Sequence, residues 1–311
     1  MTFTSFADRR GYIWLDGKFV AWRAAQTHVL THALHYGSAV FEGERVYRGS
    51  VFKLDLHTRR LVRSAQLLDF EIPFSVEQIS VATRELVRTN HIDEGYVRTI
   101  AWRGPEVMGI ATAGSAIHVA IACWPWPSYW TIERKMAGLR LEIAQWRRPA
   151  PNTAPTASKA AGLYMIASLA KDRAVRNGND DALMLDYRGL VAEATGANIC
   201  FVRGTQLHTP EPDCFLDGIT RQVVEELAAR RGFSVHRRSI EPGELVSFEE
   251  AFLCGTAAEI APIATIGEVR FKVGPSTSLL IDDFTALTAA PGEWAEAAIR
   301  RRPQLWRRLQ S

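Results

Sequence analysis

The sequence has few cysteines, and their spacing fits neither a metal site nor a disulfide framework. Cys123, Cys200, Cys214 and Cys254 are spread over 311 residues, and no C-x-x-C pair occurs. Small disulfide-rich scaffolds and zinc sites both need cysteines at short, repeated spacings. We therefore expect reduced thiols, no bound metal and a cytoplasmic protein.

Long apolar runs and an excess of charge of one sign are also missing. No segment reaches the roughly 18 apolar residues that a membrane-spanning helix needs, and the N-terminus does not resemble a signal peptide. With 37 Lys and Arg against 34 Asp and Glu, the net charge is only +3. This balance predicts neither a nucleic-acid surface nor a membrane surface. We expect Arg148 and the arginines at 300–302 and 307–308 to be solvated.

Glycine-rich nucleotide fingerprints are absent as well. The chain has no G-x-x-x-x-G-K-[ST] loop and no G-x-G-x-x-G turn, so nucleotide binding has no support. Its composition, with 47% hydrophobic and 23% charged residues, is that of an ordinary globular protein. A chain of this length predicts two domains.

Residues 1–124 predict a small α+β domain. Asp16-Gly17 has the composition of a two-residue hairpin turn, and Ser75 with Gln78 forms a capping-box pattern at the start of a helix. The expected elements are hairpins over 12–20 and 46–54, helices over about 56–69 and from residue 75, and strands over 96–102 and 117–124.

Residues 125–137 predict an interdomain loop, because each proline of Trp124-Pro125-Trp126-Pro127 removes a donor and restricts the residue before it. Residues 138–311 predict a larger second domain. Its expected elements are strands over 139–146, 182–185, 199–202, 207–208 and 252–254, and helices over about 166–174 and 220–231. Strands and helices in blocks predict an α/β (α+β) fold in two domains.

Lys159 has unusual neighbours for a lysine. It lies in Pro155-Thr156-Ala157-Ser158-Lys159-Ala160-Ala161-Gly162, where small side chains leave room for a flat partner beside the amine. An ordinary loop lysine is the alternative.

Two turns and one carboxylate offer the other groups that a charged cofactor needs. Asp217–Thr220 opens a helix and Gly255–Ala258 follows a strand, so each has free N–H groups for a phosphate, although structural capping also explains either turn alone. Glu193 lies among small and apolar residues and needs a partner, either a cationic ligand nitrogen or a nearby arginine. A lysine, a phosphate site and a buried carboxylate are what pyridoxal phosphate requires.

Seven stretches carry a resemblance to a known family, in the family's order. Over nearly its whole length the chain resembles the branched-chain-amino-acid aminotransferases, which are fold-type IV (class IV) pyridoxal-phosphate enzymes. The matching stretches are His35–Gly43, Tyr96–Arg98, Ala150–Thr153, Lys159–Tyr164, Glu193–Asn198, Gly218–Arg221 and Gly255–Glu259. The resemblance implies pyridoxal 5′-phosphate at the interface of two domains and at least a homodimer. It also implies transfer of the amino group of Leu, Ile or Val to 2-oxoglutarate.

The same resemblance assigns the cofactor residues. Lys159 would form the Schiff base and act as the general base at Cα. Glu193 would pair with the pyridine nitrogen, and Tyr164 with the phenolic oxygen. The phosphate would be bound by Arg60, Gly196, Ile219, Thr220 and Thr256.

Substrate residues follow from the resemblance too. Arg98 would meet the distal carboxylate of glutamate or 2-oxoglutarate. Tyr96 and the N–H groups of Thr256, Ala257 and Ala258 would bind the α-carboxylate. The apolar wall would be formed by Phe41, Tyr164, Trp126 and Tyr129, and by Tyr36 and Ile110 from the second subunit.

One departure and several alternatives stay open. Glu44 stands where the family usually has an apolar residue, and we expect it to affect donor preference. The same fold also supports D-amino-acid transaminases, (R)-amine transaminases and a lyase that acts on aminodeoxychorismate, but Phe41–Arg45 and Tyr96–Arg98 favour the branched-chain activity. A non-catalytic homologue is the remaining alternative, and the intact lysine, carboxylate and tyrosine argue against it.

Overall fold

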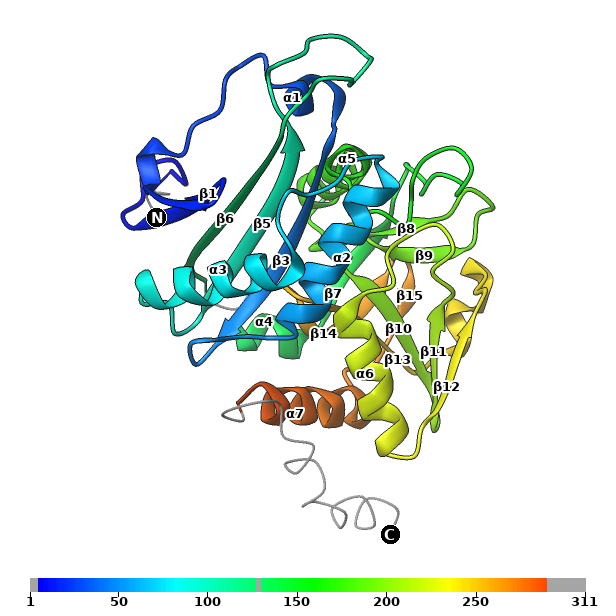
Figure 1. Cartoon of the computed structure of the whole chain (residues 1–311). Coiled ribbons are helices and arrows are strands. Elements are labelled where there is room, and N and C mark those ends of the chain that lie inside the picture. The colour runs from blue at the N-terminus through cyan, green and yellow to red at the C-terminus, as the bar shows by residue number, and fades with distance from the viewer. Residues whose placement is uncertain (1–4, 127–129, 290–311) are drawn as a thin grey trace.

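Two β-sheets organise the chain, one formed by each half of the sequence (Figure 1). The computed structural model describes residues 5–126 and 130–289. The first sheet has the strand order β2-β1-β6-β5-β3-β4. The second has the order β12-β11-β10-β13-β14-β7-β8-β9, with β15 paired to β14. The predicted site residue Tyr129 lies outside the described residues.

The first sheet is antiparallel, and its opening hairpin confirms the predicted turn. Asp16 and Gly17 have φ of 46° and 89°, the left-handed pair that a two-residue hairpin turn requires. The strands are β1 (Tyr12–Leu15), β2 (Lys18–Ala21), β3 (Ala39–Tyr47), β4 (Ser50–Val51), β5 (Gly95–Arg103) and β6 (Ile117–Pro125). The helices of this half are α1 (His32–Tyr36), α2 (Leu54–Leu67), α3 (Val76–Thr89) and the short 3₁₀ helix Trp22–Ala24.

Helices α2 and α3 cover one face of the first sheet (Figure 1). The predicted capping box is confirmed at the start of α3, where Ser75 and Gln78 exchange side-chain to backbone hydrogen bonds of 3.1 and 2.8 Å. Val97 of β5 packs against Leu61 in the core beneath the helices. Side chains alternate along a strand, so Tyr96 and Arg98 of β5 face away from the helices.

The second sheet is mixed, because β7 pairs in parallel with both β8 and β14. Helices α6 and α7 pack on it through a buried apolar core. Its strands are β7 (Leu139–Ile143), β8 (Asp181–Leu185), β9 (Val191–Ala194), β10 (Asn198–Arg203), β11 (Gln206–Pro210), β12 (Ser234–Arg238), β13 (Glu250–Gly255), β14 (Glu259–Ile266) and β15 (Val269–Arg270). Its helices are α4 (Ile132–Ala137), α5 (Tyr164–Arg176), α6 (Ile219–Arg230), α7 (Pro275–Ala289) and the 3₁₀ segments Ala161–Leu163 and Pro242–Ser247.

Some elements differ from the predictions. Strand β3 begins at Ala39, whereas the sequence predicted a hairpin only from residue 46. Buried Glu42, Glu44 and Arg45 interrupt its apolar pattern, which hides the strand from a hydropathy argument. Residues 132–137 of the predicted interdomain loop form α4. The domain boundaries at 124 and 138 stay a prediction.

Glu250 of β13 caps the buried N-terminus of α7. Its carboxylate accepts hydrogen bonds from the N–H groups of Ser276 and Thr277, at 3.2 and 2.8 Å, and from the Thr277 hydroxyl at 2.6 Å. The first N–H groups of a helix have no partner within the helix, and a carboxylate there also matches the helix dipole. This interaction therefore attaches α7 to the second sheet.

Replacing Glu250 tests this attachment. We expect Glu250→Ala to lower the free energy of unfolding by about 2–4 kcal/mol, because buried donors lose their acceptor. Ser75→Ala, at the exposed cap of α3, is the matched control and should cost about 1 kcal/mol. Urea unfolding of both variants measures the difference, and equal losses would contradict the role of Glu250.

Candidate active site

A cavity lies where the two halves of the chain meet. It encloses about 600 Å³ of empty space, part of it open to solvent. All eight residues predicted to bind the cofactor line it, and only one of them comes from the first half. They are Arg60, Lys159, Tyr164, Glu193, Gly196, Ile219, Thr220 and Thr256.

The backbone of Lys159 is hydrogen-bonded to the first half of the chain. Its carbonyl accepts the N–H of Phe41 at 3.1 Å, and its N–H donates to Ser64 Oγ at 3.0 Å. Ser158 Oγ donates to the carbonyl of Ser64, also at 3.0 Å. Strand β3 therefore binds the backbone carbonyl of Lys159, and helix α2 binds its N–H.

The Lys159 amine points at an aromatic group. Nζ donates a hydrogen bond to the Tyr164 hydroxyl at 2.9 Å and lies 5.2 Å from the centroid of the Phe41 ring. The Phe41 and Tyr164 rings are themselves in contact, with centroids 4.7 Å apart. Such faces attract a cation and exclude water. The amine thus has a defined direction and an apolar wall.

Glu193 on β9 is a largely buried carboxylate, with 13% of its side chain exposed, and its polar contacts are long. Arg148 Nε lies 3.5 Å from Oε1, and Asn198 Nδ2 lies 3.4 Å from Oε2. Burial raises the pKa of Glu193 to about 7, against the opposing charges of Arg148, Lys159 and Arg221. The prediction that Arg148 is solvated is wrong, since only 6% of it is exposed and it lines the cavity beside Glu193.

A second buried carboxylate, Glu42 on β3, orients the cavity arginine. Its two oxygens accept hydrogen bonds from Arg60 at 2.6 and 2.9 Å, and His57 Nδ1 lies 2.7 Å from Oε2. Burial opposes ionisation, but Arg60 and His57 outweigh it and hold the pKa of Glu42 well below its usual range. This role of Glu42 was not predicted from the sequence. The usable signal was the spacing of His57 and Arg60, which are one helical turn apart.

The start of α6 forms the anion-binding side of the cavity. Gly218, Ile219 and Thr220 line it at the helix N-terminus, and Thr256 lines it from the turn after β13. A Cβ atom at Gly218 would overlap Asn198 Oδ1, so a larger residue there would displace the Asn198 side chain. Free N–H groups and the positive end of the helix dipole favour a phosphate at such a site.

The predicted substrate residues of β3 and β5 cluster beside this cavity. The Arg98 guanidinium lies 4.6 Å from the Phe41 ring centroid and 5.6 Å from that of Tyr96. The Trp126 ring lies next to the Tyr96 ring, with the two centroids 6.1 Å apart. Gly43 makes room for this arrangement, because a Cβ atom there would overlap the Tyr96 hydroxyl.

Four predicted residues lie outside this cluster. Ala257 and Ala258 line a neighbouring hollow that shares Tyr164 with the cavity. Tyr36 and Ile110 are 46% and 87% exposed at the protein surface. In a single chain they line neither the cavity nor that hollow.

Glu44 does not line the cavity. It pairs across the sheet with Val97, on the face that α2 covers, and accepts a hydrogen bond from Thr99 at 3.5 Å. Burial and the nearby charge of Glu42 raise the pKa of Glu44 well above its ordinary value. Any effect of Glu44 on donor preference is therefore indirect.

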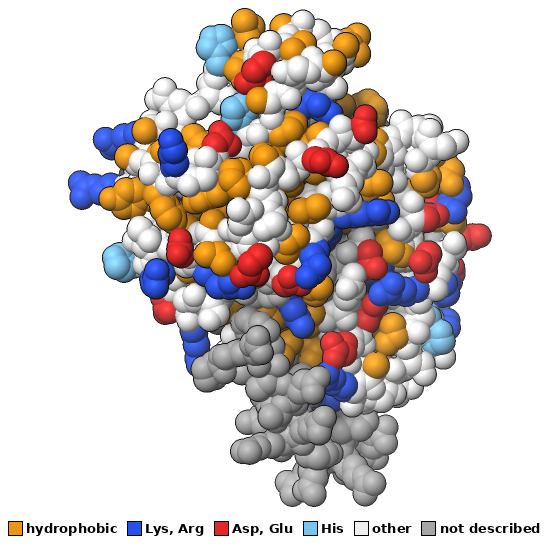
Figure 2. All heavy atoms as spheres, in the orientation of Figure 1, with side chains coloured by type: hydrophobic (Ala, Val, Ile, Leu, Met, Phe, Trp, Pro, Cys, Tyr) orange, Lys and Arg blue, Asp and Glu red, His pale blue; other side chains and the backbone are white. Residues whose placement is uncertain are grey.

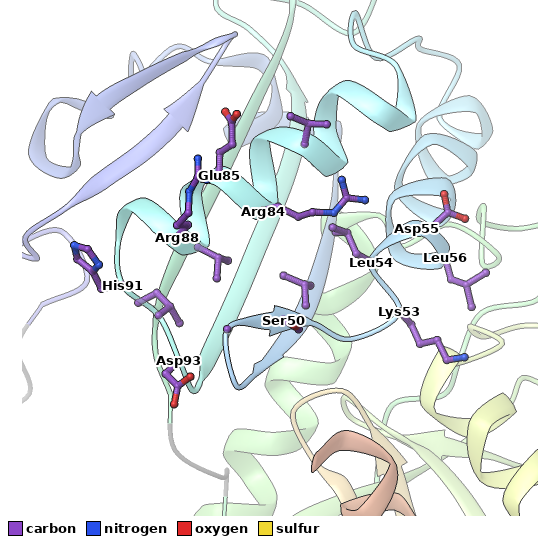
Figure 3. Close-up of a pocket in the computed structure, with 15 residues that line it drawn as sticks. Ser50, Lys53, Leu54, Asp55, Leu56, Arg84, Glu85, Arg88, His91 and Asp93 are labelled. Carbon is purple, nitrogen blue, oxygen red and sulfur yellow. The ribbon is translucent and has the colours of Figure 1, made fainter. Parts of the chain in front are cut away.

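A larger hollow lies elsewhere, between β4, α2 and α3 (Figure 3). It contains none of the predicted site residues. Figure 3 shows Lys53, Asp55 and Asp93 pointing in different directions, so its charged groups do not converge. Ligand sites combine an apolar hollow with converging polar groups, and this one is not assigned a function.

Comparison with known proteins agrees with the geometry. Residues 39–266 match the family model for amino-transferase class IV. The branched-chain-amino-acid aminotransferase of Pseudomonas aeruginosa is 40% identical over 301 residues, which cover 93% of this chain and 98% of that protein.

Solved structures give the same result. The Escherichia coli branched-chain amino acid aminotransferase superposes with a TM-score of 0.88 and 34% identity, over 92% of this chain and 98% of that one. The T.th. branched-chain amino acid aminotransferase complexed with N-(5′-phosphopyridoxyl)-L-glutamate gives a TM-score of 0.85 and 35% identity, over 95% and 96%. The predicted fold-type IV architecture is confirmed, and the chain belongs to the class IV aminotransferases.

Proposed function

We propose that this chain is a pyridoxal-phosphate-dependent aminotransferase that moves the amino group of L-leucine, L-isoleucine or L-valine to 2-oxoglutarate. One observation carries the proposal: a lysine amine, a buried carboxylate and a helix N-terminus line one cavity. Relatives named for this activity cover nearly the whole chain, and one of them is complexed with a phosphopyridoxyl-glutamate.

The residues present fit pyridoxal 5′-phosphate. Arg148 lies 3.5 Å from Glu193 but does not offset the cost of its burial, and a protonated ring nitrogen would supply a closer cation. When bound, the cofactor supplies an electron sink for the negative charge that develops at Cα. Tyr164 would meet its phenolic oxygen. The phosphate would be held by Arg60, Gly196, Ile219, Thr220 and Thr256.

The protein's own groups then handle the proton. Lys159 Nζ would remove it from Cα of the amino acid as a general base and, once protonated, would deliver it to C4′ of the cofactor as a general acid. Tyr164, 2.9 Å away, orients Nζ. The Phe41 and Tyr164 rings, in contact beside the amine, would shield it from water on that side and favour proton transfer to the substrate.

Substrate selection needs one pocket for two kinds of side chain. Arg98, at the edge of the Phe41 and Tyr96 rings, would bind the distal carboxylate of glutamate or 2-oxoglutarate. Aliphatic side chains would lie against the aromatic wall, which also includes Trp126. Tyr96 and the N–H groups at Thr256, Ala257 and Ala258 would bind the α-carboxylate.

A homodimer would complete this pocket. Tyr36 of α1 and Ile110 of the β5–β6 connection are exposed, and His32 Nε2 ties the two segments together through the Gly109 carbonyl at 2.9 Å. Val29 and Met108 are exposed nearby in sequence. Figure 2 shows hydrophobic side chains gathered over these elements at the top of the molecule. Contiguous exposed apolar surface typically marks an interface, so this tip would reach the partner's active site.

The protein would work in the cytoplasm. All four cysteines are buried and free, as is common where thiols are kept reduced. In the described part of the chain, no helix has both the length and the apolar character needed to cross a membrane.

Replacing the cavity lysine tests the reaction. We expect Lys159→Ala to remove the absorption band of the lysine-bound cofactor and to lower turnover by at least about a thousand-fold, because both the covalent link and the base are lost. Lys18→Ala, on the exposed β2, should match the wild type in both measurements. A Lys159→Ala variant with normal turnover would contradict the proposal.

A panel of amino donors tests the substrate. With 2-oxoglutarate as acceptor, L-leucine, L-isoleucine and L-valine should react faster than D-alanine or (R)-1-phenylethylamine. Initial rates at equal donor concentration measure the order. A preference for D-alanine or the amine, or release of pyruvate from aminodeoxychorismate, would replace the proposed substrate by one of the alternatives on this fold.

The raised pKa of Glu193 predicts how the stability of the apoprotein depends on pH. Because its folded pKa of about 7 exceeds the unfolded value of 4.5, the folded state binds this proton more tightly. Stability should therefore fall between pH 4.5 and 7, by about 3 kcal/mol in total, and stay level above. Glu193→Gln should remove this loss. The stability of the variant minus that of the wild type should therefore be more positive near pH 8 than near pH 5. Urea unfolding at both pH values measures the change, and parallel pH profiles would contradict it.

A further inference from the structure

Glu259 occupies a backbone conformation that side chains rarely adopt. It follows the three-residue turn 256–258 between β13 and β14 and has φ of 56°. Glycine is the usual residue at this left-handed position of a hairpin loop. A glutamate there costs on the order of 1 kcal/mol or more and persists where its surroundings fix it.

The Glu259 side chain is fixed from outside its own sheet. Oε1 accepts the Tyr47 hydroxyl at 3.0 Å, and Oε2 accepts Lys135 Nζ at 2.6 Å. Arg45 Nη2 lies 3.9 Å from Oε1. Tyr47 and Arg45 belong to β3 of the first sheet, whereas Lys135 belongs to α4, which lies beside β14 (Figure 1). One carboxylate thus joins the turn to two other parts of the fold.

Two of these three partners of Glu259 are buried. Tyr47 and Arg45 are both buried, and the Arg45 guanidinium lies 5.2 Å from the centroid of the Tyr47 ring. Burial and the Glu259 charge raise the pKa of the Tyr47 hydroxyl, so it stays protonated and remains a donor. The Glu259 side chain is only 20% exposed, which limits solvent screening of these contacts.

The turn before Glu259 borders the active site. Thr256 lines the cavity that contains Lys159, and Ala257 and Ala258 line the hollow beside it. The direction of their N–H groups depends on the dihedral angles at both ends of a three-residue loop. We propose that Glu259 is a positioning residue, whose hold on Tyr47 and Lys135 fixes the turn that binds the substrate carboxylate. This inference rests on the proposed function.

Glu259→Gly in the cofactor-loaded enzyme tests the inference, because glycine adopts the left-handed backbone without strain and removes the side chain with its carboxylate contacts. We expect KM for L-leucine and for 2-oxoglutarate to rise about ten-fold, with kcat within about two-fold, as for a loss of binding shared by ground and transition states. The dissociation constant of 4-methylvaleric acid, a carboxylic acid with no amino group to transfer, should rise by a similar factor. The absorption of the lysine-bound cofactor should stay unchanged.

Two further variants separate positioning from stability. Tyr47→Phe removes the hydrogen bond that Tyr47 donates to Glu259. It should also raise KM, by about two- to five-fold. Asp69→Gly is the matched control, since Asp69 is exposed and has φ of 55°, and it should leave KM unchanged.

A drop in melting temperature of Glu259→Gly with unchanged KM and unchanged acid binding would overturn the inference, leaving Glu259 only a link between the two halves. Failure of the proposed function would look different, since the wild-type protein itself would then lack a lysine-bound cofactor or the transaminase reaction.

Discussion

The hydrogen bonds between the Lys159 peptide and the first half of the chain are the constraint on which this active site depends. Phe41 of β3 and Ser64 of α2 bind the backbone carbonyl and N–H of Lys159, at 3.1 and 3.0 Å. The remaining cofactor residues of the second half surround the amine once its backbone is fixed. The cavity therefore exists only where the two halves dock, and a change in their docking would move the lysine relative to the aromatic ring of Phe41.

The surroundings of Glu42 and Glu193 give these two carboxylates different roles. Glu42 receives two hydrogen bonds from Arg60 and a close contact from His57, so it stays charged and serves to aim a cation. Glu193 has only long contacts to Arg148 and Asn198, so burial dominates and its pKa rises to about 7. The first carboxylate has short, bidentate contacts with its counter-charge. The second has Arg148 only at 3.5 Å, which leaves it suited to a closer cation that arrives with the ligand.

Local patterns account for much of the fold that the sequence predicted. The Asp16-Gly17 turn and the Ser75 capping box are set by neighbours in the chain, and both were correctly predicted. Strand β3 was largely missed, because its buried Glu42 and Glu44 contact residues of other elements, His57 and Arg60 of α2 and Thr99 of β5. Arg148 was placed in solvent for the same reason: its nearest charge, Glu193, is brought to it only by folding.

By itself the sequence determined the residue types of the site and, through the order of its motifs, the family. Small neighbours, apolar surroundings and helix starts made Lys159, Glu193 and the turns with Thr220 and Thr256 candidates, and the family resemblance assigned their roles. Only the tertiary structure decided that these groups share one cavity, that Glu42 aims Arg60, and that Glu259 ties a turn to β3 and α4. Distances between side chains of different elements depend on how sheets and helices pack, which residue spacing along one chain does not encode.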